Sequence, residues 1–445
     1  MSTPQPCPEP MPSEWQVFRT LLPPEVLNTL HPPAPQAVYT PWVVAWLLVY
    51  QRLHKNASLH DAVTHFLLSF PAHARPGCKR CREHTLSANT GAYSAARSNL
   101  PDRVLEVAAE RVFDTLVGAH PPSWRNRRVF LLDGTTLSLT ATEELAAAFT
   151  PASNQHGRSH WPVMHVVVAH ELASGLAAAP EYGAMYGPEA VAEVDLGVRL
   201  LPALPAGSVL LADRNFGVFG FAHGAVGAGH DVVVRLTQAR FRSMVKNGVR
   251  VDEGRWALVW KPSPHDRQAH PQLPADAAVR GWLHEVRVRG DRTLWLLSTV
   301  DATGAELAAL YRRRADIETD IRNLKVALDL DRMRGQDEPM VVKELWAALV
   351  TYNLTTQVRR LAAERLRVSP RQLSFTGVLS LVRGFLSGMH ANMTEAQHQT
   401  RFELLVRACG QRKLPKRKPG RSYPREVIPR RRKFPERKRV KPSPD

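Results

Sequence analysis

The sequence predicts an α/β fold, with a mixed sheet flanked by helices, an all-helical region before it and a basic tail after it. Three observations predict this fold. Helical stretches alternate with turns from Pro41 to about Leu116, and short β-rich runs begin at Arg128. Strands then alternate with helices up to Tyr311, a pattern typical of a mixed sheet with helices on both faces.

The same changes from helical to β-rich sequence divide the 445 residues into several parts, as is usual at this length. We expect a helical, DNA-binding domain at 1–120, a sheet-containing domain at 121–236 and 292–409, a β-rich insertion at 237–291, and a disordered basic tail at 410–445. Residues 76–101 of the helical domain are rich in Arg, Lys, Ser and Thr. They suit either phosphate contact from a helix-turn-helix-like unit or an ordinary exposed loop.

The sheet-containing part begins with three β-rich runs, VFLLDGTTLSL, WPVMHVVVAHEL and GLAAAPEYG, which favour an antiparallel meander. A helix at 189–201, the strand SVLLADRNF, a helical GVFGFAHGAVGAG and the strand DVVVRL follow. After the insertion, TLWLLSTV is the last expected strand. Thr303 with Glu306 three residues later then forms a capping box, which predicts the start of another helix.

Charge is the unusual feature of the composition. There are 59 Lys and Arg against 41 Asp and Glu, a net charge of +18. A strongly basic protein favours a polyanionic partner, nucleic acid before membrane. The tail at 410–445 supplies +12 of this charge, with fifteen basic against three acidic residues, so much of the excess is local. The tail could clamp DNA non-specifically, and its role stays open.

Four scattered cysteines are too few for a disulfide framework and favour a reducing cytoplasm. The longest apolar run, Trp42 to Tyr50, is too short to span a bilayer, and the N-terminus does not resemble a signal peptide. We therefore expect a cytoplasmic protein without a membrane partner. Cys78 and Cys81, near His73 and His84, are nominal zinc ligands, but their spacing fits no standard finger.

The segment YRRRADIETDIRNLK carries the strongest polar pattern. On a regular helix Tyr311, Arg314, Glu318 and Lys325 fall within an arc about 60° wide, beside an apolar stripe. A helix packed by that stripe would present Glu318 and the cations to one side. The alternative is a solvated helix stabilised by ion pairs one turn apart.

Two further carboxylates follow apolar strands. Asp133 ends VFLLD, where Gly134 and Thr135 predict a turn, and Asp213 ends SVLLAD. Acids at strand ends lie where open α/β sheets place ligands, and with Glu318 they form a set suited to hard divalent cations. Each acid taken singly could equally be a turn or cap residue. The combination favours phosphoryl-transfer chemistry with two metal ions.

The motifs LLDGTTLSL, LLADRNFG and Y-x2-R-x3-E-x6-K resemble those of DDE transposases of insertion-sequence family four, whose signature is the YREK pattern. The resemblance covers about residues 128–360. It implies an RNase-H-like fold with the third acid on a helix after a β-rich insertion. It also implies that Asp133, Asp213 and Glu318 bind two Mg²⁺ or Mn²⁺ ions.

By the same resemblance, Tyr311, Arg314 and Lys325 would hold the DNA backbone near the scissile bond. Arg214 and Asn215 either contact phosphate or shape the turn after Asp213. The tryptophans of the insertion either support a flipped base or are ordinary strand core residues. The remaining predicted DNA contacts are Arg235, Trp256 and Trp260.

The function implied is a DNA transposase of the bacterial cytoplasm, associated with the nucleoid. It would bind terminal inverted repeats of double-stranded DNA as a homodimer, cut at the element ends and join the 3′-hydroxyls to target DNA by transesterification. Two alternatives are a transposase-derived DNA-binding protein without catalysis and a structure-specific nuclease of the same fold.

Overall fold

The computed structural model describes residues 18, 20–55, 57–68, 74–75, 77–154, 157–288, 292–387 and 394–415. Every candidate site residue in the predicted sheet-containing part lies within these ranges. His73 and residues 416–445 of the predicted tail lie outside them. Within them, no helix combines the length and the apolar character needed to cross a bilayer.

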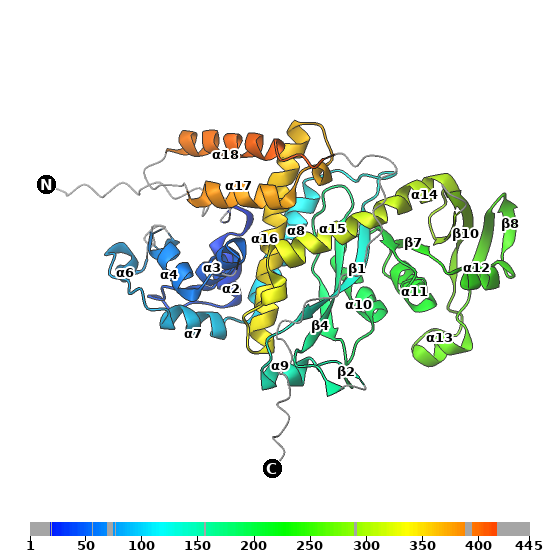
Figure 1. The fold of residues 1–445 in the computed structure, drawn as a ribbon, viewed down its shortest axis with the longest axis horizontal. Helices are drawn as coiled ribbons and strands as arrows, with labels where there is room; N and C mark the ends of the chain where they lie inside the picture. The colour runs from blue at the N-terminus through cyan, green and yellow to red at the C-terminus, as the bar shows by residue number, and fades with distance from the viewer. Residues whose placement is uncertain are drawn as a thin grey trace, which may run out of the picture. The chain divides into compact units, whose positions relative to one another are not determined.

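Nine strands of the described chain form one mixed sheet flanked by helices, as predicted, and the arrangement is consistent with an RNase-H-like fold (Figure 1). Strands β1, β6 and β7 are parallel neighbours, and antiparallel strands extend the sheet on both sides. In spatial order the strands are β5 (Glu181–Ala184), β4 (Val163–Glu171), β1 (Val129–Ser138), β6 (Val209–Ala212), β7 (Asp231–Arg235), β11 (Arg292–Ser298), β10 (Val279–Val288), β9 (Arg255–Trp260) and β8 (Val249–Asp252).

The predicted insertion contributes the outer strands of this sheet. Strands β8, β9 and β10 pair antiparallel with one another, and β10 pairs with β11, which joins them to the central strands. From β5 onward the helices between the strands are α10 (Glu193–Leu200), the 3-10 helix η1 (Leu201–Ala203), α11 (Phe219–Gly227), α12 (Gln238–Val245) and α13 (Pro264–Ala269), and α14 (Gly304–Tyr311) follows the last strand, β11. The capping box predicted from Thr303 and Glu306 is present at the start of α14.

The two faces of the central strands bury different residues, because successive side chains of a strand alternate in direction. Val129 and Leu131 of β1 share one cluster with Val209 and Leu211 of β6. The same cluster contains Leu307, Leu310 and Ile317, so α14 and the residues after it cover this face. Phe130 and Leu132 belong to the larger core on the opposite face.

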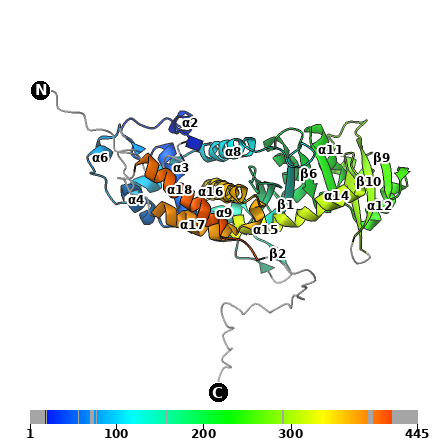
Figure 2. The ribbon, with the colours of Figure 1, turned by 90° about the horizontal axis from the view of Figure 1, so that it is seen from above.

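The N-terminal helices pack around one long helix, α16 (Glu338–Arg365), which contacts α3, α8, α17 and α18 (Figures 1 and 2). Asn353 of α16 also accepts a hydrogen bond from the Ala177 N–H and donates one to the Ala177 carbonyl, each 2.9 Å long, which fixes α16 against the sheet. The helices of this part are α2 (Pro24–Leu30), α3 (Pro41–Leu53), α4 (Leu59–Leu68), α6 (Lys79–Arg82), α7 (Gly91–Asn99), α8 (Asp102–Gly118), the 3-10 helix η5 (Pro370–Gln372), α17 (Phe375–Ser387) and α18 (Glu395–Gly410).

The helix predicted over Tyr311 to Lys325 is broken into short pieces. After α14 come the 3-10 helix η2 (Arg312–Ala315), α15 (Asp316–Arg322), the π-helix η3 (Asn323–Ala327) and the 3-10 helix η4 (Leu330–Arg332). The predicted apolar stripe is nevertheless packed: Ile317 and Leu328 are fully buried. The change in turn type means that the regular 100° spacing does not hold along this segment.

The turn predicted after Asp133 is wrong. Strand β1 continues to Ser138, because β4 supplies antiparallel partners as far as Ser138, opposite Val163. The parallel partner β6 ends earlier, at Ala212. The connection from β1 to β4 contains α9 (Glu143–Ala148) and a two-stranded hairpin of β2 (Ser153–Asn154) and β3 (Gly157–Arg158).

Candidate functional site

Three charged residues lie at corresponding positions in or directly after the central parallel strands. Leu131 of β1 pairs with Leu211 of β6, which pairs with Val233 of β7. Two residues further along the chain stand Asp133 in β1, Asp213 directly after the end of β6, and Arg235, the last residue of β7. A step of two residues returns a side chain to the same face of a strand. The three side chains are therefore expected on the same face of the sheet as the buried cluster that α14 and the following segment cover.

Tyr311 and Arg314 face this row from the covering segment. Nη2 of Arg314 lies 2.8 Å from Oδ2 of Asp133. Burial raises the pKa of Tyr311 to about 12, and the charges of Arg314, Arg235, Asp213 and Asp133 all act on this phenol. One phenol and two guanidinium groups thus surround two carboxylates at the end of β6.

Asp133 is the most strongly perturbed acid of the site. Burial raises its pKa to about 6, with upward contributions from Glu193 and Asp213 and a downward contribution from Arg314. The negative charges of Glu193 and Asp213 disfavour ionisation of Asp133. Carboxylate oxygens are suited to a hard divalent cation, whose charge would relieve this repulsion.

Glu193, which sequence reasoning missed, is a third carboxylate beside Asp133. It is the first residue of α10, and its side chain lies against the backbone of Gly134. A Cβ at Gly134 would come within 2.4 Å of Oε1 of Glu193, so a larger residue there would displace the Glu193 side chain. Nδ2 of Asn215 donates to Oε2 of Glu193 at 3.4 Å. An acid at the start of a helix is too common to single out from sequence.

Replacing Glu193 with glutamine is expected to lower the pKa of Asp133, because the substitution removes a neighbouring negative charge. Carboxyl NMR titration of aspartate-labelled, metal-free protein measures this pKa, with Asp133→Asn identifying the signal. The Asp195→Asn variant, two residues further along α10, is the control and is expected to leave the titration of Asp133 in place. An unchanged midpoint in Glu193→Gln would contradict the expected contact.

Glu318 does not reach the two aspartates in this conformation. Its side chain is 70% exposed, and Oε1 lies 4.0 Å from Nη1 of Arg314. Across the described part of the chain, no group of three His, Cys, Asp or Glu side chains stands close enough to hold a metal ion. The chemistry of Asp133 and Asp213 fits a divalent cation, but Glu318 would have to turn from solvent to complete the predicted triad.

Lys325 lies further along β1 instead of beside Glu318. Its Nζ donates to the Thr136 carbonyl at 2.5 Å and stands 3.3 Å from Oδ1 of Asp331. Thr136 is three residues beyond Asp133 on the same strand. The ammonium group therefore extends the cationic groups of the site along β1.

A buried ion pair fixes the short helix that carries Glu318. Asp320 of α15 has no exposed surface, and Oδ2 accepts hydrogen bonds from Nε of Arg371, at 3.1 Å, and from Nη2. Arg371 also donates to the carbonyls of Glu171 and Leu172 at the end of β4. The guanidinium thus links α15 to the edge of the sheet.

The other predicted DNA contacts divide into exposed and packed side chains. Arg214 and Asn215 are exposed, and the backbone N–H of Asn215 donates to Oδ1 of Asp213 at 2.8 Å, which shapes the turn. Trp256 packs edge-on against Phe241, with ring centroids 5.6 Å apart. Trp260 packs in the same way against Phe219 at 5.4 Å. These contacts are those of strand residues covered by helices, while the predicted contact with DNA remains a prediction.

The nominal zinc ligands give little support for a metal. Cys78 and Cys81 are buried free thiols, whereas His84 is exposed at a positive φ of 52°. Among the described residues, no third His, Cys, Asp or Glu joins Cys78 and Cys81 in a group that could hold a metal ion.

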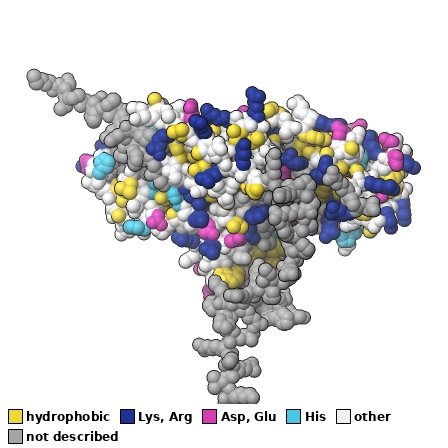
Figure 3. Space-filling model, turned by 45° about the horizontal axis from the view of Figure 1, so that its top comes forward, with side chains coloured by type: hydrophobic (Ala, Val, Ile, Leu, Met, Phe, Trp, Pro, Cys, Tyr) yellow, Lys and Arg dark blue, Asp and Glu magenta, His cyan; other side chains and the backbone are white. Residues whose placement is uncertain are grey.

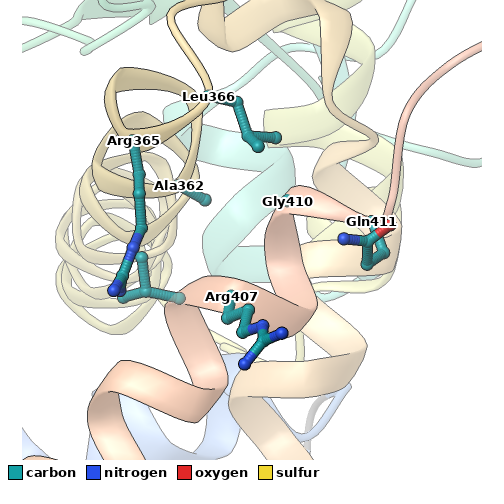
Figure 4. Close-up of a pocket in the computed structure, with 7 residues that line it drawn as sticks. Ala362, Arg365, Leu366, Arg407, Gly410 and Gln411 are labelled. Atoms are coloured by element: carbon teal, nitrogen blue, oxygen red, sulfur yellow. The ribbon is translucent and has the colours of Figure 1, made fainter.

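The surface of the described residues also carries scattered charges (Figure 3) and several pockets. In the space-filling view, Lys and Arg side chains are scattered over the visible face with acidic ones between them (Figure 3). A pocket of about 260 Å³ between the end of α16 and α18 is lined by residues that include Arg365, Leu366, Arg407 and Gln411 (Figure 4). It contains none of the candidate site residues.

Comparison with known proteins gives one family. The family model described as "Transposase DDE domain" matches residues 124–354, just over half of the chain. The match begins before β1 and ends within α16, so it includes Asp133, Asp213 and the segment from Tyr311 to Lys325. A search of the curated proteins finds no match.

Proposed function

Because the chain belongs to the transposase DDE domain family, we propose that it is a DNA transposase that binds terminal inverted repeats, cleaves at the element ends and joins the 3′-hydroxyls to target DNA. Insertion-sequence family four is the proposed subgroup, on the YREK pattern. The observation that supports this proposal most is that Asp133, in β1, and Asp213, directly after the neighbouring parallel strand β6, are both faced by Tyr311 and Arg314.

DDE transposase domains generally use divalent metals, and we propose two Mg²⁺ or Mn²⁺ ions here. Asp133 and Asp213 would hold them, with Glu318 as the third ligand once its exposed side chain has turned inward. When bound, the ions supply an activated water or 3′-hydroxyl and stabilise the leaving oxygen at phosphorus. Glu193 would remain beside Asp133 as a further negative group.

The cations and the phenol would position DNA. Arg314 now pairs with Asp133, and a phosphate oxygen would replace that carboxylate as its partner. Tyr311 stays protonated at physiological pH because its pKa is about 12, so its hydroxyl can donate to phosphate. Arg235 and Lys325 would contact the backbone on either side, which orients the scissile bond without reading sequence. Two element ends must be processed together, so a homodimer is the proposed active form.

Glu318→Gln is expected to abolish cleavage and joining of labelled terminal-repeat DNA in Mg²⁺ while DNA binding persists. The variant retains the size of the side chain and removes the charge that the metal needs. The matched control is Glu364→Gln, since Glu364 is similarly exposed, at 67%, on α16. The probe is a duplex carrying the inverted repeats found on either side of the gene, and products are resolved by denaturing electrophoresis.

Each outcome of this experiment decides between functions. Cleavage and joining by the unmutated protein, lost in Glu318→Gln and retained in Glu364→Gln, support a transposase. Cleavage without joining would point to a structure-specific nuclease. Binding without cleavage by the unmutated protein, in Mg²⁺ and in Mn²⁺, would leave a transposase-derived DNA-binding protein and refute the proposal.

A further inference from the structure

Trp161 is the one tryptophan among the described residues whose side chain is open to solvent, with 51% of its surface exposed. The tryptophans predicted to contact a base, Trp256 and Trp260, are instead partly buried against aromatic neighbours. A single exposed apolar side chain needs no explanation by itself. The position of Trp161 in the fold is what makes its exposure informative.

Trp161 stands where the β1–β4 ladder ends. Val163 of β4 pairs with Ser138 at the end of β1, and the Leu139 N–H donates to the Pro162 carbonyl at 2.9 Å. Trp161 is the residue before this anchored proline. Its ring meets the His160 imidazole nearly edge-on, with centroids 4.8 Å apart, in a run of exposed residues that follows β3 beside the labelled β2 strand of Figure 1.

The position of Trp161 continues the line from the candidate site along β1. Ser138 is five residues beyond Asp133, and Trp161 lies two residues beyond Val163, the partner of Ser138. At about 3.3 Å per residue these seven steps place Trp161 up to about 23 Å from Asp133, the length of about seven base pairs of DNA. Lys325, bound to the Thr136 carbonyl, lies between them along the strand.

We propose that Trp161 stacks on an unstacked base of the bound DNA about seven base pairs from the scissile phosphate. The inference rests on the proposed function for the location of the DNA. An aromatic face is attractive to any base and tolerates any sequence. We do not expect electrostatic attraction to dominate this contact. The segment that connects β1 to β4 contains the exposed Arg158 but also the exposed acids Glu143 and Glu144.

Binding is tested with two fluorescein-labelled probes, the terminal-repeat duplex and a 30-nucleotide oligo(dT) strand. Trp161→Ala is expected to weaken both complexes roughly 5- to 100-fold, the range of one lost base stack. The slope of affinity against salt is expected to stay unchanged, since no phosphate contact is removed. Trp161→Phe retains an aromatic face and is expected to bind within about threefold of the unmutated protein.

Indole fluorescence supplies a second readout. Oligo(dT) is expected to quench part of the emission of the unmutated protein and of Trp256→Phe, and this part is expected to disappear in Trp161→Phe. A Trp161→Ala complex within twofold of the unmutated one, or quenching that survives Trp161→Phe and vanishes in Trp256→Phe, would overturn the proposal. Cleavage is measured separately, so an inactive protein that still shows Trp161 quenching refutes the proposed function and not this contact.

Discussion

Asparagine in place of Asp133 is expected to abolish DNA cleavage and at the same time to stabilise the metal-free protein at neutral pH. Loss of a metal-binding carboxylate is expected to slow cleavage at least roughly a thousandfold, about 4 kcal/mol. The stabilisation follows from burial, which raises the pKa of Asp133 from 3.8 to about 6. In the folded protein burial favours the neutral form of this carboxyl group, and the uncharged amide of asparagine resembles that form.

The sign of the pH dependence follows from the same shift. Between 3.8 and about 6 the folded protein binds the proton more tightly than the unfolded chain, so ionisation of Asp133 lowers stability as the pH rises. The difference between these two pKa values corresponds to a destabilisation of about 3 kcal/mol at most. This destabilisation is fully present above pH 6 and absent below the unfolded pKa. Urea unfolding in EDTA at pH 7.5 and near pH 3.5 measures the difference between the variant and the unmutated protein.

The exposed Asp276 provides the control for this experiment. Asp276→Asn is expected to change neither cleavage nor the urea midpoint. An Asp133→Asn protein that still cleaves at the normal rate would remove Asp133 from the proposed metal site. Destabilisation of that variant at pH 7.5 would show instead that the ion pair with Arg314 outweighs the burial of the carboxylate.

Loss of the Arg371 guanidinium is expected to destabilise the protein by about 3–5 kcal/mol, because Arg371→Met leaves the Asp320 carboxylate buried without its cation. The measurement is the free energy of unfolding in urea. Arg371→Met with Asp320→Leu removes both charges and is expected to recover most of the loss, as apolar replacement of a whole buried pair usually does.

A more exposed ion pair, between Arg313 of η2 and Asp316 at the start of α15, offers a comparison. Nε of Arg313 lies 2.7 Å from Oδ2 of Asp316, with the two side chains 46% and 31% exposed. Arg313→Met is expected to change stability by less than about 1 kcal/mol, because water replaces an exposed partner. Similar losses in Arg313→Met and Arg371→Met would contradict the importance of burial for the Asp320 pair.

The central strands were predictable because their sequence signals are local. Apolar runs ending in Asp133 and Asp213 give β1 and β6, and period-two alternation then places both acids on one face. The sequence signals for the capping box at Thr303 and for the burial of Ile317 were likewise local. The assignment of these acids to a metal site remains a prediction, although the structure does bring them level.

Features that depend on partners distant in sequence could not be predicted. Strand β1 passes through the expected turn at Gly134 because β4 pairs with it, and β4 begins at Val163. Glu193 lies against the backbone of Gly134, beside Asp133. No regular spacing in the sequence connects position 193 with position 133, so this contact could not be predicted. The break between α14 and α15 moves Glu318 and Lys325 off a common arc, since helical arithmetic assumes one turn type throughout.

The link between Asp320 and Arg371 also has a consequence for protein synthesis. A ribosome delivers the chain from its N-terminus, so every proposed metal ligand emerges before residue 371. Until then the helix bearing Glu318 lacks the cation that ties it to the end of β4. A nascent or prematurely terminated polypeptide would therefore carry the acids without a fixed third element. Competence to cut DNA would therefore arise only after residue 371 has been synthesised and has reached Asp320.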